Sequence, residues 1–381
     1  MANRLTALQE QGQGVWLDYI RRNMLQSGEL RGLIENDGLR GMTANPTIFQ
    51  QAIAAGNDYD ESVSRLIRAG AEPIDIYEAV AVEDIQAAAD QFTPVYESTN
   101  GADGYVSLEV APSLARNTEG TIDEARRLWK MVGRPNLMIK VPGTKEGVPA
   151  IKLLLSEGIN VNVTLLFSLD AYEAVAWAYV EALEARAAKG EPVDRIASVA
   201  SFFVSRIDTL VDSMLDAKLA NIPNPSDRDT IERLKGKAAI ANAKLAYESF
   251  GKIFGGDRFA ALKAKGARVQ RPLWASTSVK NPAYSDLMYV EALVGPDTVD
   301  TMPRDTLEAF RDHGTAARTV DQGLDDARQT MKTLAEVGID FKKVTDQVET
   351  EGVDKFVASF DDLVAGIESK RAALVASGTR A

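Results

Sequence analysis

Short apolar runs alternate with longer stretches of helical period along this chain, and this alternation limits its fold more than any other feature. The run at 197–204 is apolar without strict alternation, as expected of a strand buried on both faces. Eight runs are predicted to be strands, the last two on weaker signals: 15–18, 39–43, 105–110, 136–141, 159–164, 196–202, 269–275 and 298–302.

Strands that alternate with helices in this way predict an α/β fold, a (β/α)8 TIM barrel. A doubly wound open sheet is the alternative. Additional helices are expected within 47–104, and the pattern is helical from Arg304 onward. We therefore expect a single barrel domain over residues 1–381, with a helical C-terminal extension from about 304 to 381 packed on the barrel.

Two helix starts carry the pattern of a capping box, in which a side chain before the helix pairs with an acid three residues later. Thr121 with Glu124 is one such pair, and Asp170 with Glu173 is the other. The sequence thus predicts helices that begin at these two places.

The chain has no cysteine and a single histidine, His313. Disulfides, thiol catalysis and cysteine-based metal sites are excluded, and one histidine cannot build a His-rich zinc site. His313 is expected at a surface helix end, and no metal is expected. Any acid–base chemistry must then come from carboxylates, lysine, tyrosine or hydroxyl groups.

The 55 acidic residues outnumber the 43 Lys and Arg and give a net charge of -12. This charge argues against general binding to nucleic acid or to an anionic membrane, but it permits a small anionic substrate. No apolar run reaches the ~18–20 residues that span a bilayer, and the N-terminus lacks the apolar core of a secretory signal. The expected location is the cytoplasm.

Lys140 ends the apolar run 136–140, and a tight turn follows at 141–144. An amine at the tip of a buried strand is unusual, because burial disfavours the ammonium form. Such a lysine can act as a neutral nucleophile. The alternative is a lysine whose stem is buried and whose amine reaches water.

Polar residues also mark the ends of the other predicted strands, where a barrel places its chemistry. They are Asp18, Asn45, Glu109, Asn162, Thr164, Ser201 and Ser276. Each has a simpler explanation: Asp18 and Asn45, for example, could cap helices. Glu109 inside a barrel needs a partner, and Lys140 on the next strand is the expected one.

Together, an amine, two carboxylates and several hydroxyls match aldol chemistry through a Schiff base. The amine adds to a ketone and loses water to form an iminium, which withdraws electrons from the neighbouring C–C bond. A carboxylate removes the proton of the hydroxyl beyond that bond, and the bond breaks. No metal is required.

The chain resembles the transaldolases, Schiff-base enzymes of the class I aldolase superfamily, in their longer bacterial form. The resemblance covers about 15 to 303 and is most specific in Leu-Met-Ile-Lys-Val-Pro at 137–142 and in Asn-Val-Thr-Leu-Leu-Phe-Ser at 162–168. The other matching stretches are 16–18, 41–47, 106–110, 201–208 and 274–281.

The resemblance implies catalytic roles for four residues. Lys140 would form the Schiff base, and Asp18 would take the hydroxyl proton during C–C cleavage. Glu109 and Thr164 would hold and activate a water for dehydration and hydrolysis. Glu109 also favours a transaldolase over the shorter fructose-6-phosphate aldolases, which carry glutamine there.

The resemblance also implies a substrate-binding set. Its members are Asn45, Asn162 and Ser201 for the substrate hydroxyls, Phe203 for the pocket shape, and Arg206 and Ser276 for the phosphate. Many members carry an arginine two residues after the serine that corresponds to Ser276. This chain does not, and Lys280 is the expected second phosphate cation.

The implied reaction belongs to the non-oxidative branch of the pentose phosphate pathway. A dihydroxyacetone unit passes from sedoheptulose 7-phosphate to glyceraldehyde 3-phosphate, giving erythrose 4-phosphate and fructose 6-phosphate, without a cofactor. The partners would be sugar-phosphate substrates. The oligomeric state is expected to be either a monomer or a homodimer. The alternatives are a lyase that releases free dihydroxyacetone, a pyridoxal-phosphate enzyme and a non-catalytic binding barrel.

Overall fold

The computed structural model describes residues 3–54, 57–220 and 222–376. Eight parallel strands form a closed barrel in chain order, because β8 pairs with β1. The predicted TIM barrel is confirmed, and the open-sheet alternative is wrong. The strands are β1 (Gln13–Asp18), β2 (Gly41–Thr43), β3 (Tyr105–Glu109), β4 (Leu137–Pro142), β5 (Val161–Leu166), β6 (Ser198–Phe203), β7 (Arg271–Ala275) and β8 (Thr298–Met302).

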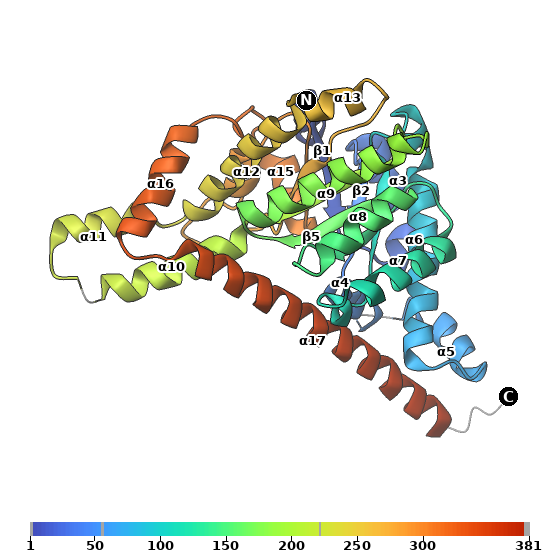
Figure 1. The fold of residues 1–381 in the computed structure, drawn as a ribbon. Coiled ribbons are helices and arrows are strands. Elements are labelled where there is room, and N and C mark those ends of the chain that lie inside the picture. The colour runs from blue at the N-terminus through green and yellow to red at the C-terminus, as the bar shows by residue number, and fades with distance from the viewer. Residues whose placement is uncertain (1–2, 55–56, 221, 377–381) are drawn as a thin grey trace.

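Helices surround the barrel and cover the outer faces of the strands (Figure 1). Every residue of β3, β4, β5 and β6 is buried, which explains why these segments read as nearly continuous apolar runs. The extra helices expected after β2 are α4 (Pro46–Ala54), α5 (Asp60–Arg68) and α6 (Pro73–Ser98). The other helices before β8 are α1 (Arg4–Glu10), α2 (Arg22–Gln26), α3 (Glu29–Asn36), the 3-10 turn η1 (Pro112–Leu114), α7 (Thr118–Val132), α8 (Gly147–Glu157), α9 (Leu169–Ala188), α10 (Ser205–Leu219), α11 (Pro225–Glu232), α12 (Ala238–Phe254), α13 (Asp257–Lys263) and α14 (Met288–Ala292).

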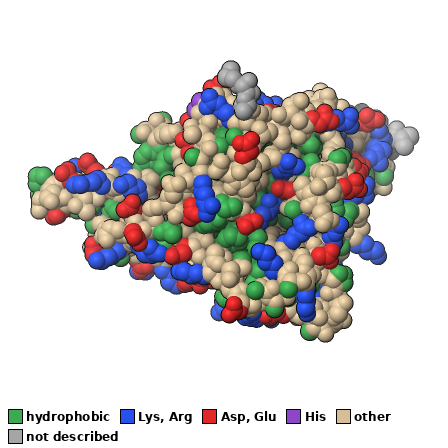
Figure 2. All heavy atoms as spheres, turned by 90° about the horizontal axis from the view of Figure 1, so that it is seen from above, with side chains coloured by type: hydrophobic (Ala, Val, Ile, Leu, Met, Phe, Trp, Pro, Cys, Tyr) green, Lys and Arg blue, Asp and Glu red, His purple; other side chains and the backbone are tan. Residues whose placement is uncertain are grey.

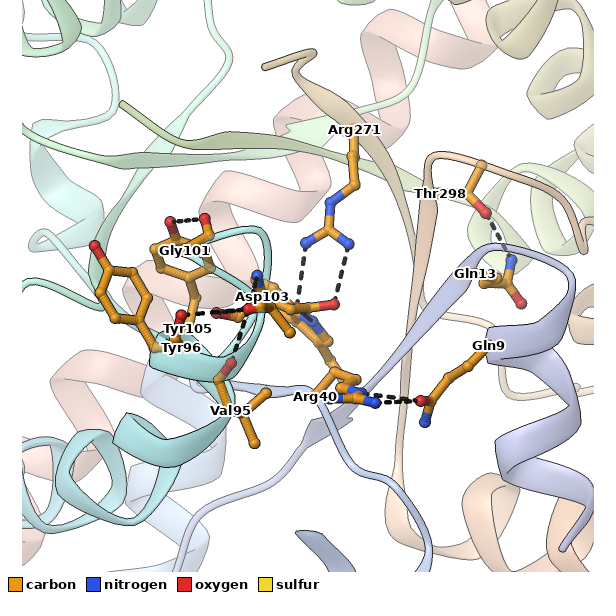
Figure 3. A network of polar contacts seen from close by, with 12 residues as sticks. Gln9, Gln13, Arg40, Val95, Tyr96, Gly101, Asp103, Tyr105, Arg271 and Thr298 are labelled. Carbon is orange, nitrogen blue, oxygen red and sulfur yellow. Dashed lines mark hydrogen bonds and ion pairs between the residues drawn. The ribbon is translucent and has the colours of Figure 1, made fainter. Parts of the chain in front are cut away.

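A polar network fills the barrel at its N-terminal end (Figure 3). Asp103 accepts a hydrogen bond of 2.8 Å from Nε1 of Trp16 and two bonds, of 3.1 and 3.2 Å, from the guanidinium of Arg271. Gly41 leaves room for the indole, since a Cβ there would lie 2.5 Å from the ring of Trp16. This end of the barrel is therefore closed by a large side chain and a paired charge, and the chemistry is left to the other end.

Within the described residues, the segment from Arg304 to Ala376 is mainly helical, as predicted. It forms α15 (Arg304–His313), α16 (Leu324–Glu336) and α17 (Phe341–Ala376). The long helix α17 runs along one side of the molecule from α10 towards α5 (Figure 1), and it also packs on α4, α6, η1 and β5. It thereby connects elements that lie far apart in the sequence.

The helix start predicted from Thr121 and Glu124 is wrong. Helix α7 begins four residues earlier, because its N-cap is Asn117, whose side chain accepts from the backbone N–H of Gly120. Thr121 lies inside the helix, and the carboxylate of Glu124 accepts from the N–H of Ala111 at 2.9 Å. Glu124 thus ties α7 to the segment after β3.

The pair Asp170 and Glu173 is not a capping box either. Ser168 caps α9 by accepting from the N–H of Ala171, so Asp170 already lies in the first turn. Glu173 instead accepts a hydrogen bond of 2.6 Å from the hydroxyl of Ser249 on α12. A tertiary contact has replaced the expected local one.

The face in Figure 2 carries acidic and basic side chains interspersed with one another. His313 is the last residue of α15, with a half-exposed side chain, as predicted. Over the described ranges, no helix combines the length and the apolar character needed to cross a lipid bilayer.

Candidate active site

A cavity of about 820 Å³ opens at the carboxyl ends of the barrel strands. It gathers side chains from β1, β4, β5, β6 and the segments that follow β2, β6 and β7. All the predicted site residues line it except Glu109 and Asn162: Asp18, Asn45, Lys140, Thr164, Ser201, Phe203, Arg206, Ser276 and Lys280. Residues that are dispersed over the sequence are therefore brought to one place.

Lys140 and Glu109 form a buried ion pair. They are opposite one another in the register of β3 and β4, and Nζ lies 3.0 Å from Oε2. Lys140 is 4% and Glu109 7% exposed, so the predicted pairing is confirmed and the view of Lys140 as a lysine that reaches water is wrong. Burial raises the pKa of Glu109, and the charge of Lys140 opposes that rise. Glu109 therefore lies where it can exchange a proton with the amine.

Asp18 is the last residue of β1, and Thr43 lies opposite it on β2. The hydroxyl of Thr43 donates to Oδ1 of Asp18 at 2.7 Å and lies 2.7 Å from the hydroxyl of Thr301. Burial raises the pKa of Asp18, whereas the charge of Lys140 and the bond from Thr43 lower it. Helix α2 begins at Arg22, so Asp18 does not cap it.

Thr164 lies at an irregularity of β5. The pairing of β5 with β6 shifts between Val163 and Leu166, and Leu165 has a φ of 59°, which is rare for a residue with a side chain. The hydroxyl of Thr164 is fully buried and, among the residues that the structure describes, has no hydrogen-bond partner. An unpaired buried hydroxyl is costly, and a water or substrate group in the cavity would satisfy it.

Asn162 and Ser201 form one hydrogen-bonded unit. The side-chain amide of Asn162 donates to the hydroxyl of Ser107 at 3.0 Å, and its oxygen accepts from Ser201 at 2.7 Å. Asn162 is fully buried and lies opposite Lys140 in the register of β4 and β5. Asn162 does not line the cavity, whereas Ser201 does. Asn162 can therefore affect the cavity by orienting the hydroxyl of Ser201.

Asn45 caps helix α4, as the alternative explanation predicted, and it also lines the cavity. Its side-chain oxygen accepts from the N–H of Ile48 at 3.0 Å, at the start of α4, and the residue also lines the cavity. Helix capping fixes the orientation of this amide beside the cavity.

The outer part of the cavity is cationic. Arg206, in the first turn of α10, holds its guanidinium 5.4 Å from the ring centroid of Phe203, and burial lowers its pKa. Ser276 follows β7 with a φ of 57°, and its hydroxyl lies 2.9 Å from that of Ser205. Nζ of Lys280 donates to the hydroxyl of Ser278 at 2.6 Å. These groups can hold an anion together.

Sequence reasoning missed the contribution of α17, whose residues Val348, Glu351, Lys355 and Phe356 line the cavity. The ring centroid of Phe356 lies 5.4 Å from Nζ of Lys140 and 6.0 Å from Cζ of Arg206. The apolar spacing of Val344, Val348 and Phe356 is typical of a buried helix face, but it does not show what that face covers. Thr43 and Thr301 were missed as well, although both lie at strand ends.

Within the described part of the chain, no three His, Cys, Asp or Glu side chains are grouped so that they could hold a metal ion. The charged groups beside Lys140 are instead arranged around its amine. The arrangement suits proton transfer to and from an amine and its adducts.

Known proteins are similar to this chain over most of its length. Residues 15–367 match the transaldolase/fructose-6-phosphate aldolase family. A transaldolase of Trichodesmium erythraeum is 49% identical over 97% of this chain and 98% of its own length. Transaldolases of Mycolicibacterium smegmatis and Thermobifida fusca are each 47% identical and cover 94% and 98% of this chain, and 95% and 100% of their own lengths. The chain belongs to the transaldolase/fructose-6-phosphate aldolase family.

Proposed function

We propose that this protein is a transaldolase that transfers a dihydroxyacetone unit between sugar phosphates through a Schiff base on Lys140. The observation that carries the proposal is the buried pair of Lys140 and Glu109, at 3.0 Å, beside a cavity that also contains Asp18 and the cationic group of Arg206 and Lys280. The curated relatives named transaldolase support the reaction type.

In the proposed first half-reaction, the neutral amine of Lys140 attacks the ketone of sedoheptulose 7-phosphate. Glu109, with a water held by the unpaired hydroxyl of Thr164, moves the protons that turn the carbinolamine into an iminium and water. Asp18 then takes the proton of the C4 hydroxyl. The C3–C4 bond breaks, erythrose 4-phosphate leaves, and the bonding electrons form a three-carbon enamine on Lys140.

In the second half-reaction the enamine carbon attacks the aldehyde of glyceraldehyde 3-phosphate. Asp18 returns its proton to the new hydroxyl, and hydrolysis of the iminium releases fructose 6-phosphate. Ser201, oriented by Asn162, and Asn45 would hold the hydroxyls of the three-carbon unit. Phe203 would bound the pocket, and Arg206, Ser276 and Lys280 would bind the phosphate.

We further propose that residues 1–381 act as one domain, with the helices after Arg304 as its extension. Sugar-phosphate substrates and the absence of cysteine fit a cytoplasmic enzyme that uses no cofactor. Both a monomer and a homodimer fit this proposal.

The test is borohydride reduction in the presence of fructose 6-phosphate, followed by peptide mass spectrometry. A three-carbon adduct on Lys140 is expected, and Lys140→Arg should give none while keeping its fold by circular dichroism. A folded wild-type protein without an adduct contradicts the Schiff base, and an adduct on another lysine contradicts the assignment of the site.

A second assay separates the transferase from an aldolase. Fructose 6-phosphate is supplied with or without erythrose 4-phosphate, and both sedoheptulose 7-phosphate and free dihydroxyacetone are measured. A transaldolase needs the acceptor for turnover. Release of dihydroxyacetone at the same rate without the acceptor would identify a lyase instead.

A further inference from the structure

The cationic end of the cavity receives side chains from three separate parts of the chain. Arg206 comes from α10, Lys280 from the segment after β7, and Lys355 from α17. Lys355 lies outside every stretch on which the family resemblance was based. It is nevertheless part of the same wall as the two cations expected to bind phosphate.

None of these three cations is in an ion pair with a carboxylate of the residues that the structure describes. Burial lowers the pKa of Lys280, and the positive charges of Lys355 and then Arg206 lower it further. Glu351, one turn before Lys355 on α17, acts electrostatically on Arg206. The like charges of these three side chains repel one another, and a bound anion relieves that repulsion.

The sequence of α17 permits this close approach. A Cβ at Gly352 would lie 3.1 Å from Nη1 of Arg206 and 3.1 Å from Cδ2 of Leu165, which is tighter than ordinary contact. The glycine therefore lets the helix backbone pass against the guanidinium. Residues three and four positions later share that helix face, so Lys355 and Phe356 are directed to the cavity.

We propose that Lys355 is a third phosphate-binding residue, which α17 supplies to the phosphate site formed by Arg206 and Lys280. The proposal rests on the proposed function, because it names a residue that binds that enzyme's substrate. Lys355 is exposed, so its flexible stem can bring the ammonium group to an incoming phosphate. It adds a third positive charge to the cavity lining that already contains Arg206 and Lys280.

The test compares Lys355→Met with the wild type in three measurements. Calorimetry gives the Kd for inorganic phosphate, steady-state kinetics give kcat and KM for fructose 6-phosphate, and borohydride trapping uses dihydroxyacetone, which has no phosphate. We expect the Kd and the KM to rise roughly tenfold, as for loss of one hydrogen bond to a charged group. The kcat and the trapping rate should stay within about twofold of wild type.

Two further variants are matched controls. Lys355→Arg keeps the charge and should keep most of the phosphate affinity. Lys343→Met removes a lysine of the same helix that pairs with Asp340 away from the cavity, and it should leave all three measurements unchanged.

An unchanged Kd and KM in Lys355→Met would overturn the proposal. A trapping rate with dihydroxyacetone that falls by the same factor as the phosphate affinity would overturn it as well. The proposed function can fail separately: a wild type that binds phosphate through Lys355 but transfers no three-carbon unit would contradict the transaldolase activity and leave the phosphate contact intact.

Discussion

The ring of Phe356 lies over the amine of Lys140, with 5.4 Å between its centroid and Nζ. Phe356 is only 4% exposed and comes from α17, whereas Lys140 comes from the fourth strand of the barrel. The group proposed to carry the reaction intermediate is therefore covered by a helix outside the barrel. A benzene ring placed there excludes water from one side of the amine.

Phe356→Ala should increase the hydrolysis of the intermediate, because water gains access to the iminium on Lys140. We expect the ratio of free dihydroxyacetone to transferred product to rise several-fold. The loss of a buried phenyl group should also lower the free energy of unfolding by about 3–5 kcal/mol. Leu363→Ala is the control: Leu363 is 2% exposed on the same helix, and its truncation should destabilise the protein without changing the ratio. An equal change in both variants would show that stability alone is responsible.

Thr43→Val should shift the pH dependence of turnover. The hydroxyl of Thr43 donates to Asp18 and lowers its pKa, so its removal raises that pKa. Asp18 must be ionised to accept a proton, and activity is lost as the pH falls through its pKa. The acid limb of kcat/KM should therefore move to higher pH. Thr43→Ser keeps the hydroxyl and should keep the wild-type profile, whereas an unmoved limb in Thr43→Val would contradict the role of this bond.

Asp300 on β8 should make the protein lose stability as the pH rises from about 4 to about 8. Burial raises the pKa of this carboxyl from 3.8 to about 8, although Thr277 donates to it at 2.9 Å. The unfolded chain releases the proton near its ordinary pKa, so the free energy of unfolding falls as the pH rises from about 4 to about 8. Asp300→Asn removes this slope, and its Tm should exceed that of wild type at pH 8 and approach it near pH 4.5. A variant less stable than wild type by the same amount at both pH values would contradict this account.

Asp103→Asn should destabilise the barrel without impairing its chemistry. It leaves the partly buried guanidinium of Arg271 without its carboxylate partner, at a cost of about 1.5–3 kcal/mol. The network lies at the N-terminal ends of the strands, and none of its residues lines the cavity, so kcat should stay close to wild type. Denaturant unfolding and steady-state kinetics test the two halves of the prediction. Asp321→Asn, in the exposed pair with Arg318, should change the free energy of unfolding by less than about 0.5 kcal/mol.

The barrel was predictable because eight runs of strand length alternate with helices, and only closure lets eight parallel strands bury both faces without an exposed edge. The pair of Glu109 and Lys140 was predictable for a related reason, because a carboxylate inside an apolar strand needs a partner on the next one. Both inferences depend on which strand residues are buried, and the pattern of apolar residues in the sequence indicates this directly.

Features that depend on which elements meet were not predictable. Asp170 and Glu173 satisfy the local pattern of a helix start, yet Ser168 caps the helix and Glu173 bonds to Ser249, seventy-six residues away. The irregularity of β5 beside Thr164 includes a left-handed φ at Leu165, a position where the sequence has no glycine to indicate it. The role of α17 depends on its path across the barrel, and its apolar period shows only that one face is buried.

Phe356, whose ring lies over Lys140, comes late in the sequence, in the last helix of the described chain. All eight strands precede Phe356 in the sequence. On a ribosome the complete barrel, with its lysine already in place, is synthesised before the helix that shields that lysine. A nascent chain can therefore present the amine of Lys140 without this cover until the last long helix has emerged and docked.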